Sequence, residues 1–405
     1  MIAAHFSDLH YCEKHLEWVD KAFGYAVSDA IKRKADVAIL SGDSFDSSIH
    51  LHEPAVAAFL SRVAELAEHM PVAVLAGTAS HDRPGCLDVL HTIKGLYPVV
   101  VLDRICQAVI DDGWIVSDQW AFQSLHAAGI LISALPSINK GAVAAAAGCE
   151  NAATAAGEMI HDLCCGWSLI NLQAREAGIP TVLVTHGTVN GCVTECAHAM
   201  VSNDHEFTAR SLFDAETSAV AVGHIHAHQS WEQDGRRIAY PGSITKLIYG
   251  HKGKVGYLLW DVQPDRADFE HIETPSREMI EIESNGPPDM AKLAELAADA
   301  AGTYVRIRYQ VDTEHRHSVD QEAIRALLKD AAQVKIEARI NPVIRTRADG
   351  IGKVTSLAEK VARWAELTET EAQPLVDRLA LLDGADPDVI AGAIICGDAK
   401  REEAA

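Results

Sequence analysis

The sequence predicts an α/β protein, because short apolar strand segments alternate with stretches of helical periodicity over residues 1–275. Residues 35–41 (ADVAILS) and 71–76 (PVAVLA) are nearly continuous apolar runs, the pattern of strands that are buried on both faces of a parallel sheet. Between them, residues 54–69 carry apolar side chains at helical spacing. This order of strand, helix and strand is typical of a layered α/β core rather than of an all-β sandwich.

The remaining elements of this region are expected in the same order. Residues 142–156 are rich in alanine and continue into a helical pattern that ends near residue 177, which we interpret as a surface helix packed on the sheet. Further strands are expected at residues 2–6, 99–102, 129–135, 181–184 and 219–222, with a late β meander at 237–240 and 255–262.

The pattern changes near residue 275, and we predict three domains with boundaries at 1–275, 276–345 and 346–405. The middle region alternates strand and helix and is typical of a small α+β unit with its own core. Its expected elements are strands at 278–283, 304–311 and 333–340 and helices at about 289–301 and 319–330. The last region contains two amphipathic helices, expected at 356–367 and 369–382, before a frayed tail at 400–405.

Composition limits the classes of protein to which the chain can belong. No apolar run is long enough to span a membrane, and the first residues lack the basic stretch and apolar block of a secretory leader. The nine scattered cysteines are an odd number, which favours reduced thiols. We therefore expect a cytoplasmic protein that does not associate with membranes.

Net charge counts against nucleic-acid binding. The chain has 57 acidic and 35 basic residues, with a formal net charge of −22. Neutralisation of phosphates by Lys and Arg supplies most non-specific affinity for nucleic acids, so this balance is an obstacle to DNA binding. The one tight basic cluster, at residues 32–34, is typical of an exposed helix end.

Acidic and histidine side chains follow five of the predicted strands, where each strand ends. In layered α/β folds, ligands bind outside the carboxyl ends of the strands. Mixed carboxylate and imidazole ligands suit manganese, iron or zinc better than magnesium or calcium alone. We expect two divalent metal ions, with manganese preferred and iron, zinc or magnesium as alternatives. The residues concerned are Asp8, His10, Asp43, Asp46, His81, Asp82, His186, His224 and His226.

The spacing of these residues indicates their chemistry. Asp8 and His10 are two residues apart, which would place both on one side of an extended chain. Two metals about 4 Å apart can hold a hydroxide between them and polarise phosphoryl oxygens. His81 is the best candidate to protonate a leaving group, with Asp82 expected to orient its ring. Asp46 is expected to hydrogen-bond near the site, and His5 to be packed rather than a ligand.

Five segments resemble the calcineurin-like metallophosphoesterase superfamily, and most closely its SbcD-type DNA repair exonuclease branch. They are HFSDLH at 5–10, GDSFD at 42–46, GHIH at 223–226, YPGSI at 240–244 and KVGYLLWDV at 254–262. The resemblance covers the first 275 residues well and the following domain weakly. It implies a four-layer α/β/β/α metallophosphoesterase core with a small α+β capping domain and a helical C-terminal tail.

The resemblance also implies a role for each motif residue. Asp8, His10 and His226 bind one metal. His186 and His224 bind the second, with Asp43 bridging the two ions, and His81 is the catalytic histidine.

One segment departs from the family pattern. Where the family has Gly-Asn-His-Asp, this chain has GTASHD at residues 77–82, so Ser80 stands in the place of the asparagine that binds the second metal. A serine hydroxyl is a poorer ligand than an amide oxygen, and the loop can offer Thr78 or water in its place. We therefore predict weaker affinity at the second metal site.

The expected function is that of a metal-dependent phosphodiesterase, a hydrolase most similar to DNA exonucleases and endonucleases of the SbcD type. One alternative is a phosphodiesterase or phosphatase acting on a small phosphoester, which the acidic composition favours. Another is a weakly catalytic subunit of a DNA-processing complex.

Expected partners are DNA, a second copy of the chain in a homodimer, and an SbcC-like coiled-coil ATPase that docks on residues 356–382. The alternative for these helices is packing on their own cap domain or on a second copy. The chain has no G-x-x-x-x-G-K-S/T loop, so any use of ATP must come from a partner.

Overall fold

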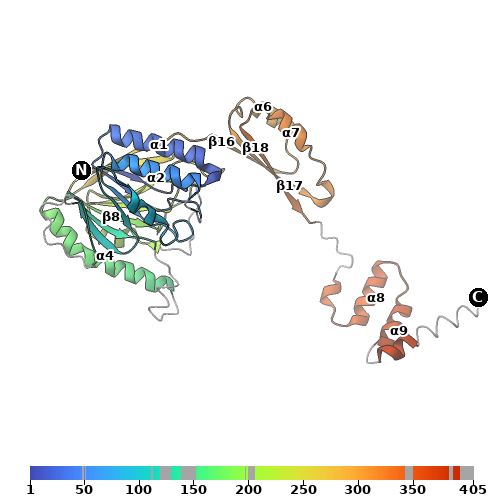
Figure 1. Cartoon of the computed structure of the whole chain (residues 1–405). Helices are drawn as coiled ribbons and strands as arrows, with labels where there is room; N and C mark the ends of the chain where they lie inside the picture. The colour runs from blue at the N-terminus through green and yellow to red at the C-terminus, as the bar shows by residue number, and fades with distance from the viewer. Residues whose placement is uncertain are drawn as a thin grey trace, which may run out of the picture. The chain divides into compact units, whose positions relative to one another are not determined.

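Two large β-sheets form the core of the N-terminal part of the chain, up to residue 273 (Figure 1). The computed structural model describes residues 1–47, 50, 52–110, 113–118, 129–137, 152–196, 198, 206–342, 350–382 and 386–392. The first sheet has six strands in the order β15-β14-β1-β2-β3-β4. The strands β1 to β4 are mutually parallel, and β14 runs antiparallel to β1. Their bounds are β1 Ile2–Phe6, β2 Val37–Leu40, β3 Val72–Leu75, β4 Val99–Leu102, β14 Gly256–Val262 and β15 Ala267–Glu273.

The second sheet has seven strands in the order β12-β13-β11-β8-β7-β5-β6. Its central strands β7, β8, β11 and β13 are parallel, so their carboxyl ends lie along one edge. The bounds are β5 Cys106–Ile110, β6 Trp114–Ser117, β7 Leu131–Leu135, β8 Thr181–His186, β11 Ala219–Gly223, β12 Gln229–Gln233 and β13 Arg236–Tyr240. The short strands β9 Thr188–Val189 and β10 Glu206–Phe207 pair separately.

The two large sheets pack face to face, and helices cover their outer faces. Ile39 and Trp260 of the first sheet share one buried cluster with Ala134 and Val184 of the second. The outer face of the first sheet packs against α1 Leu16–Lys32 and α2 Pro54–Ala67. The outer face of the second packs against α4 Ala152–Glu176 and α5 Ala209–Phe213. Figure 1 shows α1 and α2 on one side of the sheets and α4 on the other.

The helix α2 illustrates how the sequence builds these layers. It begins with Pro54 in its first turn, where a missing backbone N–H costs nothing. Its buried residues Val56, Phe59, Val63 and Leu66 recur at three- and four-residue intervals and face the first sheet. Fully burying side chains of this size stabilises the fold by about 1.5–3 kcal/mol each.

Several predicted elements are confirmed and others were missed. β1 and β4 have the expected bounds, and α2 begins where expected but ends two residues earlier than predicted. β8 extends to His186, which makes this residue the last of its strand. β12 was not predicted because polar residues leave it no apolar pattern, and β6 was missed although it begins with three apolar residues. β5 was missed because the buried Gln107 interrupts its apolar run, where it donates to Ser133 Oγ at 2.8 Å.

A third sheet of three strands lies in the order β16-β17-β18. It comprises β16 Met279–Asn285, β17 Tyr304–Asp312 and β18 Gln333–Asn341, accompanied by α6 Met290–Leu296 and α7 Gln321–Leu327. The order of elements agrees with the sequence, but both helices are shorter than expected. Leu293, Val305, Ile307 and Ile324 are buried and give this region its own small core.

The chain divides into two compact units. One consists of Met1–Glu283, Pro288–Arg308 and Gln321–Glu337, and the other of Ser284–Pro287, Tyr309–Asp320 and Ala338–Ala405. The second unit contains α8 Leu357–Leu367 and α9 Ala372–Leu382, which pack on one another. Short 3-10 helices occupy Glu13–His15, Cys86–Thr92, Thr313–His315 and Ile351–Lys353. The domain boundaries at 275 and 345 stay predictions.

Two expectations fall partly outside the described residues. The alanine-rich segment 142–151 and the tail 400–405 are not described, and neither are Cys149 and Cys396. None of the seven described cysteines forms a disulfide. Within the described ranges, no helix combines the length and apolar character needed to cross a membrane.

Candidate metal centre

The predicted ligands meet where the carboxyl ends of strands from both large sheets come together. The loops that follow β1 and β2 are joined by backbone hydrogen bonds, from Asp8 N to Gly42 O at 3.2 Å and from His10 N to Asp43 O at 3.1 Å. The backbone N–H of His224, which follows β11, donates to Asp8 Oδ2 at 3.0 Å. This bond ties the ligand loops of the two sheets to each other.

Four of the expected ligands have backbone φ angles in the left-handed region. The angles are 51° for Asp8, 50° for His10, 52° for Asp43 and 100° for His224. The expectation that Asp8 and His10 lie along an extended chain is therefore wrong. Left-handed residues turn the chain sharply, and each costs of order 1–3 kcal/mol unless the surrounding structure enforces it. Here the backbone bonds between neighbouring loops enforce it.

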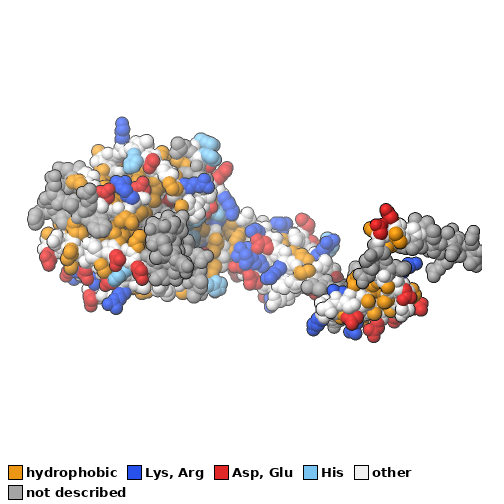
Figure 2. All heavy atoms as spheres, turned by 90° about the horizontal axis from the view of Figure 1, so that it is seen from below, with side chains coloured by type: hydrophobic (Ala, Val, Ile, Leu, Met, Phe, Trp, Pro, Cys, Tyr) orange, Lys and Arg blue, Asp and Glu red, His pale blue; other side chains and the backbone are white. Residues whose placement is uncertain are grey.

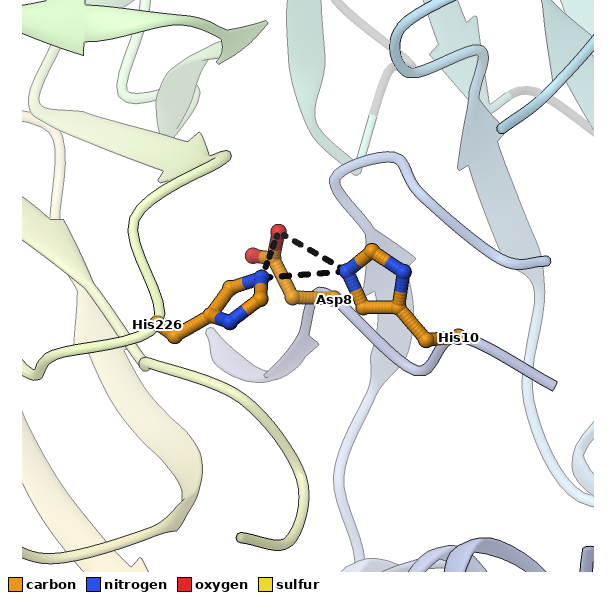
Figure 3. A group of neighbouring side chains, drawn as sticks. All are labelled: Asp8, His10 and His226. Atoms are coloured by element: carbon orange, nitrogen blue, oxygen red, sulfur yellow. Dashed lines mark hydrogen bonds and ion pairs between the residues drawn. The ribbon is translucent and has the colours of Figure 1, made fainter. Parts of the chain in front are cut away.

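Asp8, His10 and His226 form the first ligand group (Figure 3). The Nε2 atoms of the two imidazoles lie 3.0 Å apart. Asp8 Oδ1 lies 3.9 Å from His10 Nε2 and 3.7 Å from His226 Nε2. Figure 3 shows both rings turning a nitrogen toward the Asp8 carboxylate. All three atoms are electron-pair donors to metals, so a divalent cation between them satisfies the whole group.

Asp43, His186 and His224 form the second ligand group. His186 is fully buried, and its Nδ1 lies 2.7 Å from the Ser41 carbonyl oxygen. Because a carbonyl only accepts, Nδ1 carries the proton, and Nε2 faces Asp43 Oδ2 at 3.2 Å. Two acceptors at this distance require a proton or a metal ion between them. The chemistry of the donor set therefore fits a metal ion here too.

The electrostatics of both groups favour a cation. Burial alone would lower the pKa of His186, but the Asp43 carboxylate raises it to about 9. Burial likewise opposes a charged His10, yet Asp46, Asp43 and Asp8 raise the pKa of its ring above the usual value. Burial would raise the pKa of Asp43, but His186 holds it well below its usual range. The same negative potential attracts divalent ions.

Glycine is required at two positions beside the ligands. A Cβ atom at Gly77 would lie 2.2 Å from the backbone nitrogen of Asp43. A Cβ atom at Gly42, where φ is 101°, would lie 2.3 Å from His186 Nδ1. These glycines let the loops after β2 and β3 approach the second group closely.

His81 lies at the edge of the ligand groups. Its Nδ1 donates to the Asp46 carbonyl oxygen at 2.6 Å, and its Nε2 lies 4.0 Å from Asp43 Oδ2. The His81 ring meets the His10 ring edge to face, with centroids 4.7 Å apart. Its side chain is 29% exposed, so a substrate can reach it. Asp46 also contributes its side chain, with Oδ1 at 3.5 Å from His10 Nδ1, near the site as expected.

Asp82 does not take the place expected of it. Its buried carboxylate accepts hydrogen bonds from the backbone N–H groups of Gly77 at 3.0 Å, Ser44 at 3.2 Å and Phe45 at 3.3 Å. Burial raises its pKa to about 6, with a further contribution from Asp43. Asp82 thus joins the loops after β2 and β3, and the backbone of Asp46 makes the orienting contact to His81. Neighbouring residues in this turn point in different directions, which adjacency in sequence could not reveal.

Ser80 is also displaced from its expected position. It is exposed, and its hydroxyl donates to Thr78 Oγ1 at 3.3 Å. Thr78 is the residue beside the second group, because its backbone N–H and its hydroxyl donate to Asp43 Oδ1 at 2.7 and 2.9 Å. The two extra residues of this loop form a turn in which the N–H groups of His81 and Asp82 both reach the Thr78 carbonyl.

Two residues near the ligands were not predicted. Glu195 Oε1 lies 3.9 Å from His226 Nδ1, on the side of the ring away from Asp8. The Ser7 hydroxyl donates to Asp8 Oδ2 at 2.6 Å. Ser7 stands next to a motif residue. The buried Asp8 carboxylate needs hydrogen-bond donors, and this need could have indicated Ser7. Glu195 follows no strand, so no pattern in the sequence placed it.

Comparisons with known proteins give a distant relative. No protein-family model matches the chain. It is 23% identical over 334 residues to the DNA double-strand break repair protein Mre11 of Archaeoglobus fulgidus. The match covers 71% of this chain and 63% of that protein, so the chain spans less than two thirds of its relative's length. This distant similarity supports placement in the metallophosphoesterase superfamily that the motifs resemble.

Among solved structures, the chain is similar to GAP50, the anchor in the inner membrane complex of Plasmodium. The sequence identity is 13%, the TM-score is 0.41, and the match covers 68% of this chain and 87% of that one. A similarity this weak gives no information about function.

Proposed function

We propose that the protein is a manganese-dependent phosphodiesterase that cleaves DNA, of the SbcD type. The observation that carries the proposal is the convergence of two carboxylate–imidazole groups at the meeting edge of the two sheets. The distant similarity to a DNA double-strand break repair protein supports DNA as the substrate.

In this proposal each ligand group holds one divalent ion. Asp8, His10 and His226 would hold the first, and His186 and His224 would hold the second. Asp43 would serve both ions, a role supported by its electrostatic influence on the imidazoles of both groups, His10 and His186. Divalent ions supply Lewis-acid activation of the phosphoester and of water.

The residues of the chain supply position and a proton. His81 donates a proton from Nε2 to the leaving oxygen, and the Asp46 carbonyl holds its ring by the bond to Nδ1. A general acid in this position contributes about 10²–10⁴-fold to the rate. Ser7 and the N–H of His224 hold the Asp8 carboxylate by hydrogen bonds and so orient it toward the first ion.

The proposed architecture is a four-layer α/β/β/α core over residues 1–275. The outer layers are α1 with α2 and α4 with α5, and the two large sheets are the inner layers. Residues 276–345 are the α+β capping domain and residues 346–405 the helical segment. A cytoplasmic location completes the proposal.

The helices α8 and α9 are the proposed docking site for a coiled-coil ATPase subunit of the SbcC type. Leu357, Trp364 and Leu367 on α8 are exposed by 62%, 40% and 46%. Figure 2 shows hydrophobic side chains on the surface of this C-terminal segment. A homodimer is proposed on the resemblance alone.

A second candidate is a phosphodiesterase acting on a small phosphoester, and the charge of the protein favours it. The net charge is −22. On the three-stranded sheet, Arg306 pairs with Glu281, and Lys335 pairs with Glu337. These pairs neutralise basic side chains that could otherwise contact a DNA backbone.

A cleavage assay on the purified full-length chain tests the proposal. The protein is incubated with Mn²⁺ and labelled linear or circular DNA, beside a chromogenic phosphodiester. We expect cleavage of DNA that is lost in Asp43→Ala and His81→Ala. Turnover of the small phosphodiester without DNA cleavage would establish the second candidate, and absence of DNA cleavage with every divalent metal would exclude the first.

A further inference from the structure

A separate group of metal-ligand side chains lies on the outer face of the seven-stranded sheet, apart from the catalytic ligands. His161 and Cys165 are one helical turn apart on α4, and Asp214 is the residue that ends α5. None of the three belongs to the ligand groups at the strand ends. Residues four apart on a helix project from the same face, so α4 presents an imidazole and a thiol together.

The distances within this group are compatible with three ligand atoms that share one metal ion. His161 Nδ1 lies 3.6 Å from Asp214 Oδ2, which is too long for a hydrogen bond. Cys165 Sγ lies 3.7 Å from His161 Nε2 and 3.9 Å from its Nδ1. In a tetrahedral zinc site, bond lengths near 2.0 Å to nitrogen or oxygen and 2.3 Å to sulfur separate neighbouring ligand atoms by about 3.3–3.6 Å.

The two helices that carry the group, α4 and α5, are fixed by contacts on their buried faces. The buried face of α4, with Ile160, Cys164 and Trp167, packs in one cluster with Leu212 and Phe213 of α5. Thr208 caps the start of α5, and its side chain accepts a hydrogen bond from Ser211 N at 3.0 Å. Next to Asp214, the Phe213 carbonyl accepts from Arg236 Nη1 at 3.0 Å. The ligands therefore project from a rigid platform, which keeps the ordering cost of binding low.

Two members of the group, His161 and Asp214, line a surface hollow of about 450 Å³. The hollow is lined in part by Glu158, His161, Arg210 and Asp214. Glu158 is exposed and precedes His161 by three residues, on the same face of α4. Water would supply a fourth ligand.

We propose that His161, Cys165 and Asp214 form a binding site for a zinc-like divalent ion, separate from the phosphoesterase centre. The thiolate determines the choice of metal, because sulfur ligands select zinc over manganese or magnesium. The phosphoesterase groups offer only nitrogen and oxygen, so the two kinds of site differ in metal preference. The bound ion joins α4 to the end of α5.

Cobalt substitution tests this site directly. Co²⁺ bound to a thiolate gives a sulfur-to-cobalt charge-transfer absorption, whereas Co²⁺ bound at the phosphoesterase centre by nitrogen and oxygen gives none. The full chain is stripped of metal and titrated with Co²⁺. We expect the charge-transfer band in the native chain and in Cys12→Ser, a control two residues from His10, and its loss in Cys165→Ser. A band that is absent from the native chain, or that survives in Cys165→Ser, would overturn the proposal.

A second measurement needs no variant that alters the thiol. Zn²⁺ should slow alkylation of Cys165 in the folded native chain, followed by mass spectrometry of the modified peptide. In His161→Gln the apparent zinc affinity read from this protection should fall by about tenfold or more. Equal alkylation rates with and without Zn²⁺ would contradict the site, as would unchanged protection in His161→Gln.

Discussion

The two ligand groups at the strand ends use the same chemistry but differ in the segments that hold their carboxylates. In the group of Asp8, His10 and His226, three donor atoms lie within 3.0 to 3.9 Å of one another. In the group of Asp43, His186 and His224, Asp43 Oδ2 lies 3.2 Å from His186 Nε2, and Asp43 Oδ1 accepts hydrogen bonds from Thr78. Asp8 is held by Ser7 and by the backbone N–H of His224, whereas Asp43 is held by Thr78, from a loop that departs from the family pattern.

The difference originates in the loop after β3 and not in the strands. Both groups are positioned by parallel strands whose carboxyl ends meet, and both contain residues with left-handed backbone angles. Only the second group borders the loop in which Thr78 contacts Asp43 and Ser80 is exposed. Loops can thus tune the affinity of one metal site while the fold preserves the other.

The largest effect is expected for Asp43→Ala, which removes the carboxylate that acts on both groups. Turnover of phosphodiesters should fall by more than about 10³-fold, since electrostatic stabilisation of the transition state is lost. Steady-state kinetics with Mn²⁺ would measure it, with Asp103→Ala, an exposed carboxylate, as the matched control. If Asp43→Ala retained most of its activity, the two groups would not act as one centre.

The next effect is expected for His81→Ala. Loss of the proton donor should lower kcat by about 10²–10⁴-fold. Both metal affinities should stay as in the native chain, because His81 lies at the edge of the groups, 4.0 Å from Asp43. Calorimetric titration with Mn²⁺ gives the affinities. A loss of metal binding together with activity would identify His81 as a ligand instead.

Much of this centre was predictable from the sequence, and the limits have physical causes. Asp43 and His186 were found because each follows a continuous apolar strand, and such strands must end at the ligand-binding edge of the sheet. The roles of Asp82 and Ser80 were not predictable in the same way, because they depend on how a turn directs each side chain. The left-handed backbone at His10 and the approach of Glu195 to His226 arise from contacts between distant segments.

The fold shows the same division. Strands β1, β4 and β11 were predicted because each is a largely apolar run that no exposed residue interrupts. β12 lies at the edge of its sheet, and its residues are half-exposed or exposed. Its sequence is therefore mostly polar and has no apolar pattern that would predict a strand. Helices α6 and α7 were predicted too long, because the helical pattern of the sequence continues into the turns that follow each helix.

A moderate effect is expected from restoring an amide beside the second group. Thr78→Asn places an amide oxygen at the residue that contacts Asp43, and it should tighten the weaker metal site by about tenfold. Ser80→Asn serves as the matched variant, because Ser80 is exposed, and it should leave both affinities unchanged. If metal affinity increased only in Ser80→Asn, residue 80 and not residue 78 would be the position that provides the ligand.

The smallest effect concerns His5, which is buried behind the second group. Its Nε2 lies 2.7 Å from Ser41 Oγ, and the Ser41 carbonyl in turn accepts from His186. Burial lowers the pKa of His5 from 6.5 to about 3. The unfolded chain therefore binds a proton below pH 6.5 that the folded chain does not bind until about pH 3, so stability falls as the pH decreases through this window.

At pH 5 the loss attributable to His5 is about 2 kcal/mol. Denaturant unfolding of the native chain and His5→Gln at pH 7.5 and pH 5 measures it. The loss of stability between the two pH values should be smaller in His5→Gln by about this amount. Identical losses in the two proteins would show that His5 is protonated in the folded state.

The most direct test of the difference between the two ligand groups is a calorimetric titration of the metal-free full chain with Mn²⁺. We predict two sites of unequal affinity. His226→Ala should abolish the tighter one, and Thr78→Asn should strengthen only the weaker one. Two sites of equal affinity in the native chain, or loss of the weaker site in His226→Ala, would contradict the assignment.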